Sequence, residues 1–153
     1  MIALATSLAK SNPNGKWKHG AVFAKGNKVL SLGQNNERPV GPLTHKTTHA
    51  EIACFKEGNW LKTPGHLYVS RVPLGWPGSV SLSKPCKDCL LWLKENTRVR
   101  CIYWTVPGPQ IYNNLDLRNV DLEYLRSYAS SGTTTFGSMH PSRMASREDL
   151  KLL

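Results

Sequence analysis

Two short clusters in the sequence contain residue types that can hold and use a metal ion. They are His49-Ala50-Glu51 and Pro85-Cys86-Lys87-Asp88-Cys89. Imidazole nitrogen and thiolate sulfur suit Zn²⁺, and a site with three protein ligands keeps a fourth position open for water. Zinc lowers the pKa of such a water to about 7, and a nearby carboxylate can move protons without binding the metal. The sequence therefore predicts a hydrolytic zinc site with ligands His49, Cys86 and Cys89 and with Glu51 as the proton carrier.

The segments around these clusters predict an α/β domain. Helices are expected over residues 2–10, from about His49 to Glu57 after a cap at Thr47 or Thr48, over Cys86–Glu95 and over Leu117–Tyr128. Strands are expected at 19–25 and 28–34, forming a hairpin around Gly26-Asn27, and at 66–72 and 99–105; residues 35–47 are expected to be a loop. Right-handed crossovers would place the helices that begin at His49 and Cys86 on one face of the sheet, where their N-termini converge.

Length and composition are those of a soluble globular protein. The 153 residues predict one domain over residues 1–129, with residues 130–153 as a loose tail or short helix. No apolar run reaches the roughly 18 residues of a membrane span, and the first ten residues lack the features of a signal peptide, so we expect no membrane association and a cytoplasmic location. In a reducing compartment, Cys-x-x-Cys favours metal or redox chemistry over a structural disulfide. Cys54 and Cys101 are expected in the core.

The net charge of +10 is unevenly distributed. Residues 101–153 hold five basic and five acidic residues, so the positive excess lies within residues 1–100, which also hold the predicted site. This distribution favours an anionic substrate or nucleic acid as a partner. A solvated basic surface without a specific partner is the alternative.

The pattern His-x-Glu followed by Pro-Cys-x-x-Cys resembles the signature of the zinc-dependent cytidine/deoxycytidylate deaminase superfamily. The resemblance covers about residues 1–106. It implies a three-layer α/β/α fold with a central mixed sheet of about five strands. It also implies deamination of a cytosine nucleoside or nucleotide with release of ammonia, Zn²⁺ held by His49, Cys86 and Cys89, and Glu51 carrying protons to the ring nitrogen and the leaving group.

Two substrate contacts are implied by the same resemblance. Asn35, which follows the second predicted strand, resembles the asparagine that contacts the sugar in this superfamily. The backbone N–H of Ala50 is similarly placed to hold the carbonyl of a pyrimidine. Asn35 could instead be a turn former, and Glu51 could instead complete a capping box with Thr48.

The identity of the substrate stays open at this stage. Ala53 stands where deoxycytidylate deaminases commonly have asparagine, Lys87-Asp88 departs from the tRNA adenosine deaminases, and the insertion at residues 71–83 departs from the polynucleotide cytosine deaminases. Deamination of cytosine or adenine within single-stranded DNA or tRNA is therefore an alternative, with Trp76 as a base-stacking or loop-packing residue. A zinc-stabilised nucleic-acid binder, a redox Cys-x-x-Cys and a closed zinc site completed by His45 or His19 are further alternatives. A homo-oligomer is compatible with the sequence.

Overall fold

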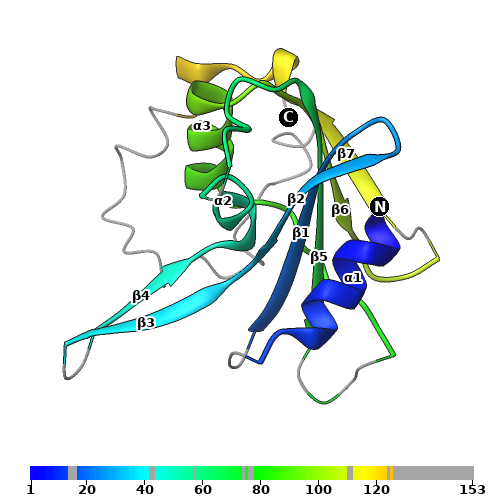
Figure 1. The fold of residues 1–153 in the computed structure, drawn as a ribbon. Helices are drawn as coiled ribbons and strands as arrows, with labels where there is room; N and C mark the ends of the chain where they lie inside the picture. The colour runs from blue at the N-terminus through cyan, green and yellow to red at the C-terminus, as the bar shows by residue number, and fades with distance from the viewer. Residues whose placement is uncertain are drawn as a thin grey trace.

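The predicted hairpin around Gly26-Asn27 forms the start of a larger sheet in the computed structural model (Figure 1). The structure describes residues 1–13, 17–41, 44–56, 58–73, 75, 78–109, 112–123 and 125, with the backbone alone for 37–41 and 44–47. The elements in chain order are α1 (Ile2–Ser11), β1 (Trp17–Lys25), β2 (Lys28–Gln34), β3 (Asn36–Gly41), β4 (Thr44–Thr48), α2 (Ala50–Ala53), β5 (Gly65–Pro73), α3 (Lys87–Asn96), β6 (Val99–Thr105), β7 (Tyr112–Asp116) and the 3₁₀ turn Leu117–Asn119.

The main sheet has five strands in the order β2-β1-β5-β6-β7. The β5–β6 pair is parallel, and the other pairs are antiparallel. This confirms the expected mixed sheet of about five strands and the α/β class. The parallel pair is joined through α3, the crossover that delivers the Cys-x-x-Cys cluster to the edge where β5 ends (Figure 1).

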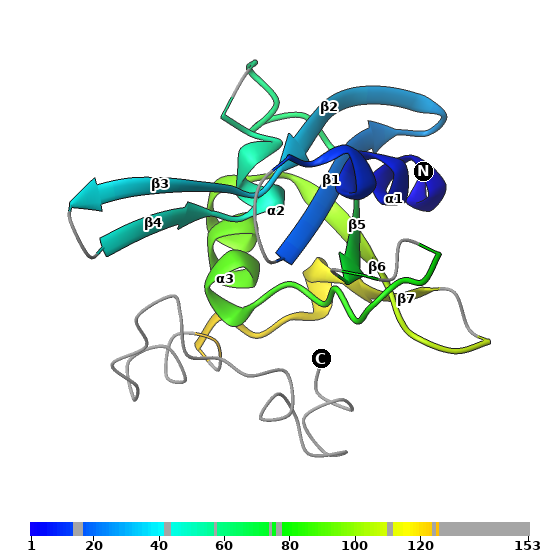
Figure 2. The ribbon, with the colours of Figure 1, turned by 90° about the horizontal axis from the view of Figure 1, so that it is seen from below.

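Helices cover both faces of this sheet, which gives three layers (Figures 1 and 2). Two glycines on adjacent strands permit the close approach. A Cβ on Gly20 would lie 2.4 Å from the carbonyl oxygen of Ala5 in α1, and a Cβ on Gly33 would lie 2.2 Å from that of Ala50 in α2. The face under α1 and the face under α2 and α3 are called the α1 face and the α2/α3 face below.

The core lies mainly on the α2/α3 face. Its fully buried side chains include Phe23, Leu67, Leu90, Leu93 and Ile102. These residues come from β1, β5, α3 and β6, so apolar packing holds α3 against the centre of the sheet. Among the described residues, no helix has the length and apolar character needed to cross a bilayer.

The predicted loop at residues 35–47 was wrong. Residues Asn36–Gly41 and Thr44–Thr48 form the antiparallel ribbon β3–β4, which extends away from the main sheet (Figures 1 and 2). The segment lacks apolar alternation because the two strands pair only with each other and leave the core. Such a ribbon also tolerates Pro39, which cannot donate a ladder hydrogen bond.

The helix predicted over Leu117–Tyr128 was also wrong at its start. The preceding residues form β7. The sequence did not predict this strand because Asn and Asp, which have low strand propensity, make up three of its five residues. The chain then makes a 3₁₀ turn in which the Asp116 carboxylate accepts a hydrogen bond from the backbone N–H of Arg118. The end of that helix, Trp76 and the domain boundary at residue 129 lie outside the described residues.

Candidate metal centre and active site

His49 is placed by the junction between β4 and α2. It occupies the N-cap position of α2 with extended backbone angles (φ −71°, ψ 150°), and no side chain caps this helix. The predicted cap at Thr47 or Thr48 is therefore wrong, and the capping-box interpretation of Glu51 is not supported. The helix is also shorter than expected, because regular α-helix ends at Ala53 and a turn follows.

Cys86 and Cys89 are placed by the start of α3. Cys86 is the N-cap, and its sulfur accepts a hydrogen bond from the backbone N–H of Cys89 at 3.4 Å. Because Cys86 is the N-cap, the helix begins at Lys87, one residue later than predicted, and the fully buried Pro85 lies just before the cap. An N-terminal helix position favours the thiolate form of cysteine.

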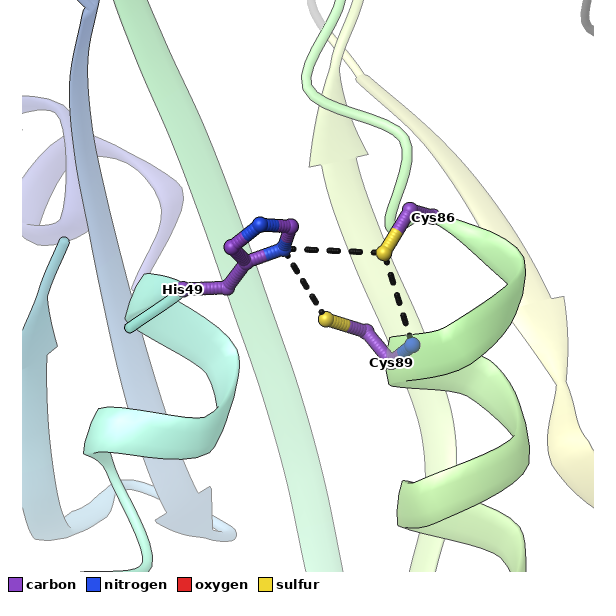
Figure 3. A group of neighbouring side chains, drawn as sticks. All are labelled: His49, Cys86 and Cys89. Atoms are coloured by element: carbon purple, nitrogen blue, oxygen red, sulfur yellow. Dashed lines mark hydrogen bonds between the residues drawn. The ribbon is translucent and has the colours of Figure 1, made fainter. Parts of the chain in front are cut away.

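The three predicted ligands meet, as Figure 3 shows. His49 Nδ1 lies 3.2 Å from Cys89 Sγ and 3.5 Å from Cys86 Sγ. All three donor atoms lie within 4.8 Å of one another. A tetrahedral zinc with Zn–N near 2.0 Å and Zn–S near 2.3 Å would separate nitrogen and sulfur by about 3.5 Å. The donor types and spacing therefore fit one Zn²⁺ with little rearrangement.

The protonation pattern of the ligands agrees with metal-site chemistry. The hydrogen bond from Cys89 and the neighbouring His49 hold the pKa of Cys86 down to about 4, against the effect of burial. The hydrogen bond between His49 and Cys86 raises the pKa of His49, although burial opposes this shift. One thiolate is thus present at neutral pH, and the pKa of Cys89 is raised because the Cys86 sulfur holds its proton. Zinc would displace the remaining protons on binding.

Glu51 lies beside this cluster and is only 5% exposed. Burial raises the pKa of its carboxyl to about 7, and the charge of His49 opposes the shift. The charge of the carboxylate acts in turn on the pKa values of His49 and Cys89, and Glu51 follows His49 by two residues in the first turn of α2. A carboxyl with a pKa near 7 can both accept and donate a proton at neutral pH.

The two predicted substrate contacts occupy different environments. Ala50 is the buried first residue of α2, where a backbone N–H has no acceptor within its own helix. The Asn35 amide is engaged inside the protein. Its Oδ1 accepts from Asn12 Nδ2 at 2.7 Å and from the His19 backbone N–H at 2.8 Å, and its Nδ2 donates to the Trp17 carbonyl at 2.8 Å. Their roles toward a substrate stay predictions.

His19 lies near the site without completing it. The metal-binding group found among the described residues consists of three ligands and excludes His19, so a closed site built with His19 is not supported. The side chain of His45 lies outside the described residues. Burial, with the charges of Arg71 and His49, lowers the pKa of His19 to about 4. The sequence offered His19 as the fourth ligand of a closed site, and alternation along β1 puts it on the same face as Ala21 and Phe23.

The other cysteines take no part in the cluster. Cys54 is 1% exposed and belongs to the core, as predicted. Cys101 is only partly buried, so the prediction of a core residue was wrong there. All four thiols are free, and the disulfide interpretation is not supported.

Comparison of the sequence with protein-family models and with curated proteins gave no match. Among solved structures, the chain is similar to the apo form of dCMP deaminase from the cyanophage S-TIM5, with a TM-score of 0.50 and 19% identity over 71% of this chain and 81% of that one. The same enzyme in complex with dCMP and dUMP matches with a TM-score of 0.42 and 19% identity over 67% of this chain and 74% of that one. The chain thus has the cytidine deaminase-like fold, and its His49/Cys86/Cys89 cluster is consistent with the zinc site of deaminases that share this fold.

Proposed function

We propose that this chain is a zinc-dependent hydrolytic deaminase that acts on a cytosine nucleoside or nucleotide. One observation carries the proposal: three donor atoms spaced for a single zinc ion lie beside a buried carboxyl group whose pKa is about 7. The fold shared with a dCMP deaminase supports the reaction class.

Deamination by water exchanges the exocyclic amino group of the ring for oxygen. One proton of the water goes to the ring nitrogen and the other leaves with the amino group as ammonia. Zinc held by His49, Cys86 and Cys89 would supply an acidified water. Glu51 in its carboxylate form would accept the first proton of this water. Glu51 then donates that proton to the ring nitrogen and carries the second to the departing nitrogen.

Substrate orientation would involve the start of α2 and the end of β2. The Ala50 N–H points from a helix N-terminus, an end of the backbone that favours an acceptor such as a pyrimidine carbonyl. Asn35 fixes the backbone near His19 through its own hydrogen bonds. We propose Ala50 as a direct contact and Asn35 as a residue at the sugar end of the pocket.

Deamination of cytosine or adenine within nucleic acid is the second candidate. The observation that favours it is the net charge of +10, with the positive excess in residues 1–100. Basic surface attracts a phosphate backbone independently of sequence.

The test is a substrate panel with zinc-loaded protein. Deoxycytidine, its monophosphate, a cytosine-containing single strand and tRNA are scored for released ammonia and for the mass of the base. Glu51→Gln serves as the inactive comparison, and Glu95→Gln, at an exposed position of α3, removes a carboxylate outside the site.

Each outcome of the panel selects one candidate. Turnover of the monomers, absent on the polymers, supports the first candidate and eliminates the second. Turnover of a polymer alone does the reverse. If zinc is bound and none of the four is converted, the chain is a zinc-stabilised binder and the deaminase proposal is wrong.

A further inference from the structure

A row of paired side chains runs along the α2/α3 face from the core to the edge that holds the metal cluster. The register pairs Phe23 with Leu67, Ala21 with Val69, and then His19 with Arg71. Residues directly opposite in an antiparallel pair project to the same face. The paired side chains therefore change from apolar, at Ala21 and Val69, to basic, at His19 and Arg71, toward the edge of the sheet that holds the metal cluster.

The backbone of Arg71 is fixed on both sides. Its N–H donates to Thr105 Oγ1 at 3.4 Å, and its carbonyl accepts from the Ser81 N–H at 2.9 Å. The guanidinium carbon lies 4.0 Å from the centre of the Trp17 ring, and Trp17 is 46% exposed. A planar guanidinium stacked on an aromatic face is held flat, with its N–H groups directed outward in its own plane.

Among the described residues, the charge of Arg71 has no ion-pair partner. Its Nε is buried without a hydrogen-bond partner, and among the residues that the structure describes the ion pair found is Asp116–Arg118, far along the chain. A buried donor on a cation is costly unless an acceptor reaches it. This points to an acceptor that the polypeptide itself does not provide in its described part.

Arg71 lies on the face of the sheet that carries the metal cluster, because Ala21 of the same row pairs with Gly33, which abuts Ala50 of α2. His19 is the register partner of Arg71, and the charges of both Arg71 and His49 act on its pKa. Burial keeps His19 neutral, so Arg71 carries the positive charge at this end of the row. An anionic group bound at Arg71 would lie on the same face of the sheet as a ring bound at the cluster.

We propose that Arg71, stacked on Trp17, binds a phosphate group of the substrate beside the metal site. The proposal rests on the proposed function for the identity of the base, and it adds that the substrate is phosphorylated. The guanidinium supplies paired N–H donors that match phosphate oxygens, and Trp17 keeps it in plane. The shared chemistry is a phosphate, either the 5′-monophosphate of a free nucleotide or a phosphodiester of a single strand.

Binding is measured by calorimetry with zinc-loaded Glu51→Gln protein, so that no turnover occurs. Deoxycytidine, deoxycytidine monophosphate and a short cytosine-containing single strand are titrated into this background and into the same background with Arg71→Gln. We expect affinity for a phosphorylated ligand to fall roughly 10- to 100-fold, the range for a lost charge-assisted hydrogen bond, while affinity for deoxycytidine stays unchanged. The matched control is Arg100→Gln, which removes an equal charge from an exposed position of β6.

The pattern of losses identifies the phosphate. A loss with the monophosphate assigns a terminal phosphate, and a loss with the strand alone assigns a phosphodiester. An equal loss for deoxycytidine and both phosphorylated ligands, or no loss beyond that of Arg100→Gln, overturns the proposal. Arg71→Lys guards against misfolding: it keeps the charge but not the planar stack, and we expect an intermediate affinity with unchanged zinc content.

Failure of this proposal differs from failure of the deaminase proposal. If wild-type protein deaminates deoxycytidine, its monophosphate and the single strand with equal kcat/KM, the reaction stands and the phosphate contact is refuted. If wild-type protein converts none of the panel, yet Arg71→Gln lowers affinity for the phosphorylated ligands, the contact stands and the reaction is refuted.

Discussion

The two faces of the sheet carry different kinds of side chain. On the α2/α3 face, ionisable groups are buried close together, and their pKa values are displaced in opposite directions, down for Cys86 and up for Glu51. On the α1 face, Tyr68 and Tyr103 stack with ring centres 4.9 Å apart, and Tyr112 meets Tyr103 edge-on at 6.0 Å.

The contrast indicates which face contributes to stability and which carries groups that reduce stability but can take part in a reaction. Aromatic pairs on the α1 face stabilise through contact and need no particular protonation state. Buried charges on the α2/α3 face cost free energy in the absence of a metal or a ligand, and such groups concentrate at functional sites. The four predictions below test this division, in order of expected effect.

Removing a metal ligand should affect the α2/α3 face alone. Cys86→Ser is expected to reduce bound zinc from one ion per chain to almost none and to abolish deamination. At zinc 100-fold above its dissociation constant, the lost binding corresponds to about 2.7 kcal/mol, or a fall in melting temperature of roughly 5–10 °C. Metal analysis and thermal unfolding measure both effects. Cys101→Ser, a free thiol outside the cluster, is the control; equal zinc content in all three proteins would refute the ligand assignment.

Neutralising Glu51 should reduce the rate of deamination without reducing zinc content or stability. Glu51→Gln keeps the shape of the side chain but cannot carry protons, so we expect kcat to fall by roughly 10²–10⁴-fold. Zinc content and melting temperature should stay at wild-type values or rise slightly, because a buried ionisable group is removed. Steady-state kinetics and metal analysis are the measurements. A variant that retains a tenth or more of the activity would remove Glu51 from the proton path.

His19 should make the α2/α3 face sensitive to acid. Its pKa is about 4 in the folded protein against 6.5 ordinarily, so the unfolded chain binds the proton more readily between these values. The stability that neutral His19 confers is complete above about pH 6.5 and is lost as pH falls toward 4, a change of at most about 3 kcal/mol. Urea unfolding of wild type and His19→Gln across this window should give a flatter pH dependence for the variant. Superimposable pH profiles would contradict the buried-neutral assignment.

Two matched glycine substitutions should distinguish the faces. Gly20→Ala and Gly33→Ala each place a methyl group against a helix backbone, so both should lose roughly 1–3 kcal/mol of unfolding free energy. Only Gly33→Ala displaces α2, and therefore only that variant should weaken zinc binding and turnover per folded molecule. Equal zinc affinity in both variants would show that α2 absorbs the shift without moving His49.

The parts of the fold that sequence predicted are those with a strong local pattern. β1, β2, β5 and β6 are apolar or alternating runs bounded by Gly and Pro, and α3 begins after Pro85 with apolar residues at helical spacing. β3 and β4 escaped prediction because their sequences show no apolar alternation. β7 escaped because three of its five side chains are exposed and Leu115 is the one buried. Strand propensity measures fit to a half-buried surface, which β7 largely lacks.

The site was predictable to a different extent for each residue. The three candidate metal ligands could be identified from residue type and spacing, and the structure brings their donor atoms together. Arg71 and Trp17 could not be found in this way. Their relation depends on the register of β1 against β5, which local sequence does not encode, and Trp17 meets Arg71 diagonally across that pair.

The separation of the three predicted ligands along the chain governs the order in which their donor atoms can come together. Cys86 and Cys89 are three residues apart and need only the first turn of α3 to face one direction. His49 is 37 residues from Cys86, so its arrival requires closure of the loop that contains β5. Closing such a loop costs entropy before any contact is gained. The dithiol is thus a local half-site available early in folding, and the complete donor set is a late product of the docked sheet.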